Sequence, residues 1–294
     1  MTAFSDWQQT ALAQIEAALD GFLTLDASAT LGEAMRYATL GGGKRIRALL
    51  CLATAEALSG QRQAALRAAC ALEMIHAYSL VHDDMPCMDN DSLRRGKPTV
   101  HIAWNEAIAL LAGDTLQARA FEVLTPNADE VPPALQAALC RLLAKASGQT
   151  GMCGGQAIDL LSVGKALTQA ELENMHRLKT GALLEAAVMM GAACAEGVAT
   201  ETQTQLQSYA RHLGLAFQVV DDVLDCTADS GTLGKTAGKD ADNDKPTYVA
   251  LLGLDAARAY AEQLHAQASQ ALQAANLGGS HLAALLDGVV RRGH

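Results

Sequence analysis

The segment that decides the fold class is residues 168–195, which read TQAELENMHRLKTGALLEAAVMMGAACA. It lies within a run from residue 134 to residue 245 that contains no proline and is rich in the helix-favouring residues Ala, Leu, Gln and Glu. Thr168 followed by Glu171 is typical of a capping box. Aromatic residues make up only 4% of the chain, and the alternation of β-branched residues expected of strands is missing. The segment therefore predicts a long helix.

The same signals extend outward to the rest of the chain. Residues 1–85 also lack proline, Ser5 and Thr30 each begin a further capping-box pattern, and no Gly- or Ser-rich linker divides the sequence. Helices are expected near 6–20, 30–40, 44–59, 63–84, 102–112, 115–124, 133–147, 151–162, 168–195 and 202–226, with more after 246. These patterns predict one all-α domain over residues 1–294.

Charge and composition exclude several classes of partner and compartment. The 294 residues include 22 basic and 32 acidic side chains, giving a net charge of −10, and no basic tract exceeds a pair, so no nucleic-acid partner is expected. The seven cysteines contain no CxxC pair and indicate free thiols in a reducing compartment. The N-terminus lacks a signal-peptide pattern, and the longest apolar run, near Ala186–Ala195, is about half a bilayer span. We therefore expect a cytoplasmic protein without membrane insertion.

Aspartates are concentrated in two clusters, with four in residues 83–91 and seven in residues 221–244. Carboxylates this close repel one another unless a cation lies among them. Both clusters adjoin apolar helical sequence, where an unpaired charge is costly. Mg²⁺ suits such a site, because it binds one or two carboxylates and completes its shell with water and phosphate. The clusters together predict a magnesium site.

Helical spacing places the carboxylates on defined faces. Pro86 is expected to disrupt the first helix and to let Asp89 turn back towards the Asp83–Asp84 pair. A 4-3-4 spacing puts each cluster on one face with other polar residues. The two faces carry Leu72, His76, Ser79 and Asp83 on the first helix, and Gly214, Gln218, Asp221 and Asp225 on the second.

Cationic side chains flank both aspartate clusters. The string GGGKRIR at residues 41–47 opens a helix, and its glycines allow the backbone to approach an anion closely. The remaining cations of interest are Arg94 and Arg95 after the first cluster, Lys179 on the long helix, and Lys235 and Lys245 after Asp225. Acids and bases together in an apolar helical setting predict a diphosphate held by metal on one side and by Arg or Lys on the other.

At these motifs the sequence resembles the trans-isoprenyl diphosphate synthases, most closely the bacterial farnesyl diphosphate synthases. The resemblance covers about residues 30–255 and rests on six strings in the family's order and spacing: GGGKRIR, EMIHAYSLVHDDMPCMDNDSLRRGKPT, GMCGGQAIDL, HRLKTGALL, GLAFQVVDDVLD and GK…DNDKPTY. It implies a bundle of mostly antiparallel helices around a deep central pocket, usually in a homodimer. It also implies a prenyltransferase that joins isopentenyl diphosphate to dimethylallyl or geranyl diphosphate to give farnesyl diphosphate.

The resemblance assigns roles by position. Three Mg²⁺ ions would be held by Asp83, Asp84, Asp89, Asp221, Asp222 and Asp225. The allylic diphosphate would be gripped by Arg94, Lys179 and Lys235, with Thr180 and Gln218 beside the reacting carbon. Isopentenyl diphosphate would be bound by Lys44, Arg47, His76 and Arg95, and supporting contacts would come from Gln156, Asp159, Asp240 and Lys245. Tyr78 would form the floor that stops the product at fifteen carbons, although Ser79 lies more directly beneath Asp83 on an ideal helix.

Four alternatives to this interpretation remain. Glu-x-x-His spacings at Glu73, Glu173 and Glu262 are those of a ferritin-like di-iron bundle. A non-catalytic partner subunit is disfavoured because both aspartate motifs are intact, and a terpene cyclase is disfavoured because no Asn/Ser/Glu metal triad follows Asp221. A geranylgeranyl diphosphate synthase of the same family differs only in product length.

Overall fold

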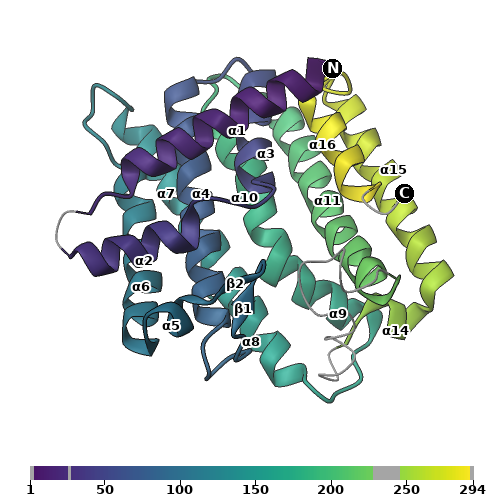
Figure 1. Cartoon of the computed structure of the whole chain (residues 1–294). Coiled ribbons are helices and arrows are strands. Elements are labelled where there is room, and N and C mark those ends of the chain that lie inside the picture. Colours follow the sequence, from purple (N-terminus) through teal and green to yellow (C-terminus); the bar gives the residue numbers. More distant parts are fainter. Residues whose placement is uncertain (1–2, 26–27, 228–245, 292–294) are drawn as a thin grey trace.

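The computed structural model describes residues 3–25, 28–227 and 246–291. Within them, helices make up almost all of the regular structure (Figure 1). The helices are α1 (Ala3–Phe22), α2 (Ala29–Thr39), α3 (Ile46–Ala57), α4 (Arg62–Asp83), α5 (Val100–Ala103), α6 (Glu106–Leu124), α7 (Pro133–Ser147), α8 (Met152–Ser162), α9 (Gln169–His176), the π-helical η1 (Arg177–Gly181), α10 (Ala182–Ala193), α11 (Thr200–Thr227), α14 (Tyr248–Leu252), α15 (Leu254–Ala274) and α16 (His281–Val290). Two short antiparallel strands, β1 (Leu93–Arg94) and β2 (Lys97–Pro98), form a hairpin. The predicted all-α class is confirmed.

Helices α4 and α10 form the centre of the bundle. Helix α4 packs against α3 and α6, whereas α10 packs against α3, α7 and α11, and α11 in turn packs against α15 (Figure 1). Helix α4 is the one described helix that is long and apolar enough to cross a membrane, but 72% of its most apolar stretch is buried within the protein. It is therefore placed as the core helix of the bundle, and it delivers the first aspartate cluster at its C-terminal end.

The predicted division into helices differs from the structure around α6 and around η1. Residues 102–112 and 115–124 were expected as separate helices, but α6 runs without a break through Gly113. A Cβ atom at Gly113 would lie 2.1 Å from Nε2 of His82 on α4. This glycine therefore serves the contact between α4 and α6 and does not end a helix. The expected helix over 168–195 is divided by the π-helical turn η1.

The predicted helix starts are confirmed at one position and wrong at two. Thr168 and Glu171 form the complete capping box at the start of α9. In contrast, Ser28 caps α2, because its hydroxyl accepts a hydrogen bond from the Leu31 amide at 3.4 Å, so Thr30 lies inside the helix. Ser5 likewise lies inside α1, which already includes Ala3. A Ser or Thr three residues before Glu or Gln thus marks a helix start only where that Ser or Thr itself has an extended backbone, as Thr168 does.

Substitution of Gly191 tests the packing of α10 on α3. A Cβ atom there would lie 2.4 Å from the carbonyl oxygen of Cys51 and 2.8 Å from Cβ of Thr54, so the two helices would have to move apart. We expect Gly191→Ala to lower the free energy of unfolding by about 1–3 kcal/mol, measured by urea denaturation. Gly21→Ala is the matched control, because no atom lies within 4 Å of its Cβ position. Equal stability of the two variants would contradict this packing.

Candidate active site

The chain turns back immediately after α4 and brings the first aspartate cluster together. The amide of Asp89 donates to the carbonyl of Asp83 at 2.8 Å, and the amide of Asp91 donates to the carbonyl of Asp84 at 3.1 Å. Asn90 supports this turn with a left-handed φ of 51°. The predicted return of Asp89 towards the Asp83–Asp84 pair is therefore confirmed by the backbone hydrogen bonds.

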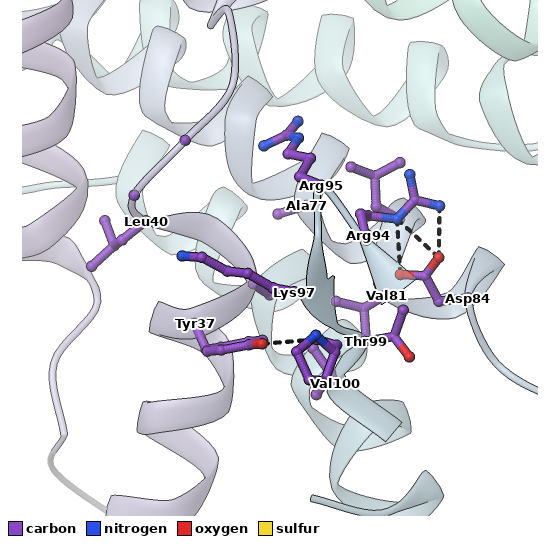
Figure 2. A pocket seen from close by; sticks show the side chains of 15 residues that line it. Tyr37, Leu40, Ala77, Val81, Asp84, Arg94, Arg95, Lys97, Thr99 and Val100 are labelled. Atoms are coloured by element: carbon purple, nitrogen blue, oxygen red, sulfur yellow. Dashed lines mark hydrogen bonds and ion pairs between the residues drawn. The ribbon is translucent and has the colours of Figure 1, made fainter. Parts of the chain in front are cut away.

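Asp84 forms a bidentate ion pair with Arg94 on the hairpin. Arg94 Nε donates to both carboxylate oxygens at 2.9 Å, and Nη2 donates to Oδ1 at 2.6 Å (Figure 2). The residue Asp84 is only 3% exposed. The hairpin turns through Arg95 and Gly96, both at positive φ, as in a type I′ turn. Both oxygens of Asp84 thus accept hydrogen bonds from Arg94, and a carboxylate in this state still has lone-pair capacity for its predicted role as a metal ligand.

Asp83 lies beside the pair but in a different electrostatic environment. Its pKa is raised to about 6, chiefly by burial and further by the nearby carboxylates of Asp89 and Asp84, while Lys179 and Arg94 oppose the shift. The carboxylates of this cluster therefore repel one another in the absence of a metal ion. A bound cation would remove this repulsion, so the donor chemistry fits Mg²⁺.

The π-helical turn η1 places Lys179 and Thr180. Two glycines allow neighbouring helices to approach its backbone. A Cβ atom at Gly155 of α8 would lie 2.1 Å from the backbone nitrogen of Lys179, and one at Gly214 of α11 would lie 3.0 Å from Cα of Gly181. Lys179 Nζ donates to Oδ2 of the buried Asp159 at 2.6 Å. Short π-helical segments are frequent at functional sites. Here η1 lies against both α8 and α11 at the predicted cation Lys179.

A chain of hydrogen bonds links η1 to the second aspartate cluster on α11. The hydroxyl of Thr180 donates to Oε1 of Gln218 at 3.3 Å, and Nε2 of Gln218 donates to Oδ1 of Asp222 at 3.0 Å. The amide of Tyr248 donates to Oδ2 of Asp222 at 2.8 Å. Asp222 is thus buried with both oxygens accepting hydrogen bonds, like Asp84, and lone pairs remain for its predicted role as a metal ligand. Asp221 and Asp225 flank it on α11.

A cavity of about 440 Å³, hereafter the main cavity, brings most of the remaining predicted residues together. Its lining includes Lys44, Arg47, His76, Arg95 and Asp221. It therefore joins the glycine-rich segment, α4, the hairpin and α11 around one space. The predicted binding residues for isopentenyl diphosphate line the same cavity as the second aspartate cluster.

The electrostatics of the main cavity favour an anion. Burial lowers the pKa of Arg47, although Glu73 and Asp221 oppose this effect. Nε of Arg47 is buried and has no hydrogen-bond partner among the described residues. Burial also lowers the pKa of His76 well below its usual range, with further lowering by the surrounding arginines. The site thus combines a buried, incompletely bonded guanidinium with a neutral imidazole.

Arg45 and Glu73 are functional-site residues that the sequence analysis missed. Arg45 is buried, and it donates to Oε1 of Glu16 at 2.8 Å, to Oε2 of Glu73 at 3.2 Å and to the carbonyl of Thr39 at 2.6 Å. Glu73 also accepts from the Ala48 amide at 3.3 Å. Adjacent cations at the start of a helix indicate that one of them faces the interior. Only the fold shows that this one is Arg45 and that it pairs with Glu16 and Glu73.

The di-iron alternative is not supported by the described residues. Glu73 is bonded to Arg45, Glu173 accepts from the Tyr260 hydroxyl at 2.8 Å, and His265 lies 2.7 Å from Oδ1 of Asp287. Among the residues that the structure describes, no three His, Cys, Asp or Glu side chains are arranged as ligands of one metal ion. Ligands from outside the protein, such as diphosphate oxygens, would have to complete any magnesium site formed by the aspartates.

Of the two predicted floor residues, Tyr78 is the one that spans helices. Its ring is buried against His82, and its hydroxyl lies 3.5 Å from Sγ of Cys153 on α8. Ser79 instead donates to the carbonyl of His76 on its own helix at 2.9 Å. Tyr78 therefore closes the space between α4 and α8 below Asp83.

The residues predicted to support the substrate contacts are only partly within the described structure. Asp159 contacts Lys179, as expected of a supporting residue. Nε2 of Gln156 is buried without a hydrogen-bond partner in the described part of the chain. Lys235, Asp240 and Lys245 lie outside the described residues.

The raised pKa of Asp83 predicts a gain in stability on neutralisation. Because the pKa of Asp83 is about 6 in the folded protein and 3.8 in the unfolded chain, the unfolded chain ionises first, and the folded state loses stability as the pH rises from about 4 to 6. In metal-free protein above pH 6, we therefore expect Asp83→Asn to raise the Tm by roughly 2–4 °C. Below pH 4 the difference should vanish, which calorimetry across pH would measure. A Tm difference independent of pH would contradict the assignment.

Comparison with known proteins identifies the family. A model of the polyprenyl synthetase family matches residues 28–277. The chain is 46% identical over 285 residues to the farnesyl diphosphate synthase of Geobacillus stearothermophilus, covering 95% of each. It is 47% identical over 260 residues to the chloroplastic geranylgeranyl pyrophosphate synthase of Capsicum annuum, covering 88% of this chain and 70% of that one. The crystal structure of geranyltransferase from Helicobacter pylori complexed with magnesium and isoprenyl diphosphate has a TM-score of 0.86 at 32% identity and covers 99% of this chain and 98% of that one. The chain belongs to the polyprenyl synthetase family.

Proposed function

We propose that this protein is a Mg²⁺-dependent short-chain prenyltransferase that condenses isopentenyl diphosphate with dimethylallyl or geranyl diphosphate and releases farnesyl diphosphate. The observation that carries this proposal is the main cavity, where Arg47, His76 and Asp221 from three different elements face one space. The farnesyl diphosphate synthase of Geobacillus stearothermophilus, which matches nearly end to end, supports the product. The relative named as a geranylgeranyl pyrophosphate synthase keeps a twenty-carbon product as the alternative.

The first chemical step is heterolysis of the allylic C–O bond. The bonding electron pair leaves with the diphosphate, and an allylic cation remains. The ammonium group of Lys179 pairs with Asp159, and its positive charge opposes the rise in the pKa of Asp83, so it acts on the aspartate cluster where the leaving diphosphate would be held. Arg94, fixed by Asp84, supplies a second positive charge at the same place. Fixed charges of this kind stabilise the developing anion without reorganisation during the reaction.

The second step joins the two substrates. The double bond of isopentenyl diphosphate attacks the allylic cation, and the new C–C bond leaves a tertiary cation. Loss of a proton to the departing diphosphate then restores a double bond. Thr180 and Gln218 are hydrogen-bonded to each other beside the second aspartate cluster, and they would orient the reacting carbon. The surrounding aliphatic helices would exclude water from both cations.

Magnesium is expected to bind Asp83 and Asp89 on the first cluster and Asp221 and Asp225 on the second. When bound, Mg²⁺ supplies Lewis-acid neutralisation of the leaving diphosphate. The relative solved with magnesium and isoprenyl diphosphate supports this choice of metal. A count of three ions, with Asp84 and Asp222 as further ligands, remains part of the proposal.

The proposal also includes features that lie outside the site. The single domain over residues 1–294, the homodimer and the cytoplasmic location all remain predictions from the sequence and the family resemblance.

Removal of one carboxylate from each cluster tests the proposed reaction. We expect Asp83→Ala and Asp221→Ala each to lower kcat by at least about 10²–10³, because each removes support from the leaving diphosphate. Product formation from radiolabelled isopentenyl diphosphate with Mg²⁺ would measure the loss. Asp129→Ala, in the exposed turn between α6 and α7, should retain full activity. Near-normal turnover in either cluster variant would refute the proposal.

Separate substitutions should distinguish the two diphosphate sites. Arg47→Ala and His76→Ala alter the main cavity and should raise the KM for isopentenyl diphosphate more than that for geranyl diphosphate. Lys179→Ala should have the opposite effect, because the positive charge of Lys179 acts on the first aspartate cluster. Steady-state kinetics with each substrate varied in turn would measure the split. Parallel changes in all three variants would show that the cations are wrongly divided.

Substitution of Tyr78 tests product length. Tyr78→Ala removes the ring between α4 and α8, so the growing chain gains space below Asp83. We expect the product to shift from farnesyl towards geranylgeranyl diphosphate, with the early condensations largely retained, as chromatography of the dephosphorylated products would show. Tyr78→Phe keeps the ring and should keep the fifteen-carbon product. If the folded, active Tyr78→Ala enzyme makes only farnesyl diphosphate, the floor lies elsewhere.

A further inference from the structure

A second cavity of about 200 Å³ lies beside the hairpin, separate from the main cavity. It is bordered by the end of α2, by α4 and by the two strands, and its cations Arg95 and Lys97 are exposed to solvent (Figure 2). Its apolar lining includes Leu40, Ala77, Val81 and Val100. We call this space the hairpin pocket.

The polar lining of the hairpin pocket is predominantly cationic. Arg94, Arg95 and Lys97 line it, and Asp84 is the single acid among its described lining residues. Asp84 is already bound by Arg94, so the charges of Arg95 and Lys97 are not balanced within the pocket. Burial and the nearby charges of Arg45 and Arg94 lower the pKa of Arg95, which is consistent with an excess of positive charge. An anion would relieve this excess.

Hydrogen bonds on both sides fix the walls of the pocket. The hydroxyl of Tyr37 on α2 donates to the carbonyl of Pro98 at 2.8 Å, which fastens the hairpin to α2 (Figure 2). The hydroxyl of Thr99 donates to the carbonyl of Asp91 at 2.7 Å and holds the base of the hairpin closed. The pocket is thus preformed, and a ligand would not have to order its walls.

The glycine-rich segment forms the boundary between the two cavities. Gly41, at φ +74°, lines the hairpin pocket, and its Cβ position lies 4.0 Å from Nζ of Lys97. Gly43 lines the main cavity, and its Cβ position lies only 2.9 Å from Nη1 of Arg95. Arg95 lines both cavities, so an anion in one changes the field that the other experiences.

We propose that the hairpin pocket is a second binding site for a small amphiphilic anion, a phosphate ester with a short aliphatic chain. The head group would bind Arg95 and Lys97, and the chain would lie against Leu40, Val81 and Val100. The volume of about 200 Å³ fits a phosphate group with a chain of a few carbons. A ligand here weakens binding of isopentenyl diphosphate in the main cavity through the shared Arg95. This last consequence rests on the proposed function, whereas the binding itself does not.

Calorimetric titration of the full chain with pentyl phosphate tests the site directly. We expect saturable binding that Lys97→Ala weakens about tenfold and that Lys97→Arg retains. Arg47→Ala should leave this Lys97-dependent binding unchanged, because Arg47 lines the main cavity and not the hairpin pocket. Lys145→Ala, an exposed cation on α7, is the control for a general loss of positive charge. Inorganic phosphate should bind at least about tenfold more weakly than pentyl phosphate, because it buries no apolar surface.

Specific outcomes would overturn the proposal. Loss of pentyl phosphate binding in Arg47→Ala but not in Lys97→Ala would place the ligand in the main cavity. Equal affinity for inorganic and pentyl phosphate would show that the apolar wall is not used, and absence of binding at millimolar concentration would refute the site. These titrations measure equilibrium binding without turnover, so they remain decisive even if the proposed prenyltransferase activity fails its own test.

Discussion

The bidentate ion pair between Arg94 and Asp84 is the interaction on which the catalytic end of the molecule depends. The Asp84 side chain is 4% exposed, and an unpaired carboxylate at such a place would be strongly destabilising. The pair holds the hairpin against the end of α4 and thereby positions Arg95 and Gly96, which form the turn between the two strands. Arg95 is turned towards the glycine-rich segment as a result. The pair lines the hairpin pocket, whereas the next residue, Arg95, lines both that pocket and the main cavity.

Helix geometry explains why the two aspartates of each adjacent pair have different surroundings. Consecutive residues on an α-helix point about 100° apart, so the two carboxylates of each pair meet different neighbours. Asp222 is therefore buried by neutral donors, Gln218 and the Tyr248 amide, while Asp221 lines the main cavity. Asp84 is buried by a cation instead, which leaves Asp83 beside the like charge of Asp89. In both motifs the second aspartate is held by hydrogen bonds from other parts of the fold.

The sequence predicted most of the helices because their signals are local. Proline-free apolar periodicity located α7 at its observed bounds, and the capping box at Thr168 located the start of α9. The sequence did not predict the π-helical turn at Lys179, because that turn is accompanied by contacts from Gly155 and Gly214, which lie far away in the chain. It also could not show that Asp84 and Asp222 are hydrogen-bonded through both oxygens. Spacing alone reveals which residue types recur, whereas their partners depend on how the helices pack.

The state of His76 follows from the same balance of charges. Burial and the surrounding arginines disfavour the imidazolium, so the ring enters the main cavity as a neutral group. A neutral imidazole still donates one hydrogen bond to a diphosphate oxygen, and it adds no further charge to a cavity that already holds Lys44, Arg47 and Arg95. Glu73 offsets part of that charge, because it raises the pKa of Arg47 and receives a hydrogen bond from Arg45. The charges that line the cavity are therefore compatible with folding, while the incompletely bonded guanidinium of Arg47 retains affinity for an anion.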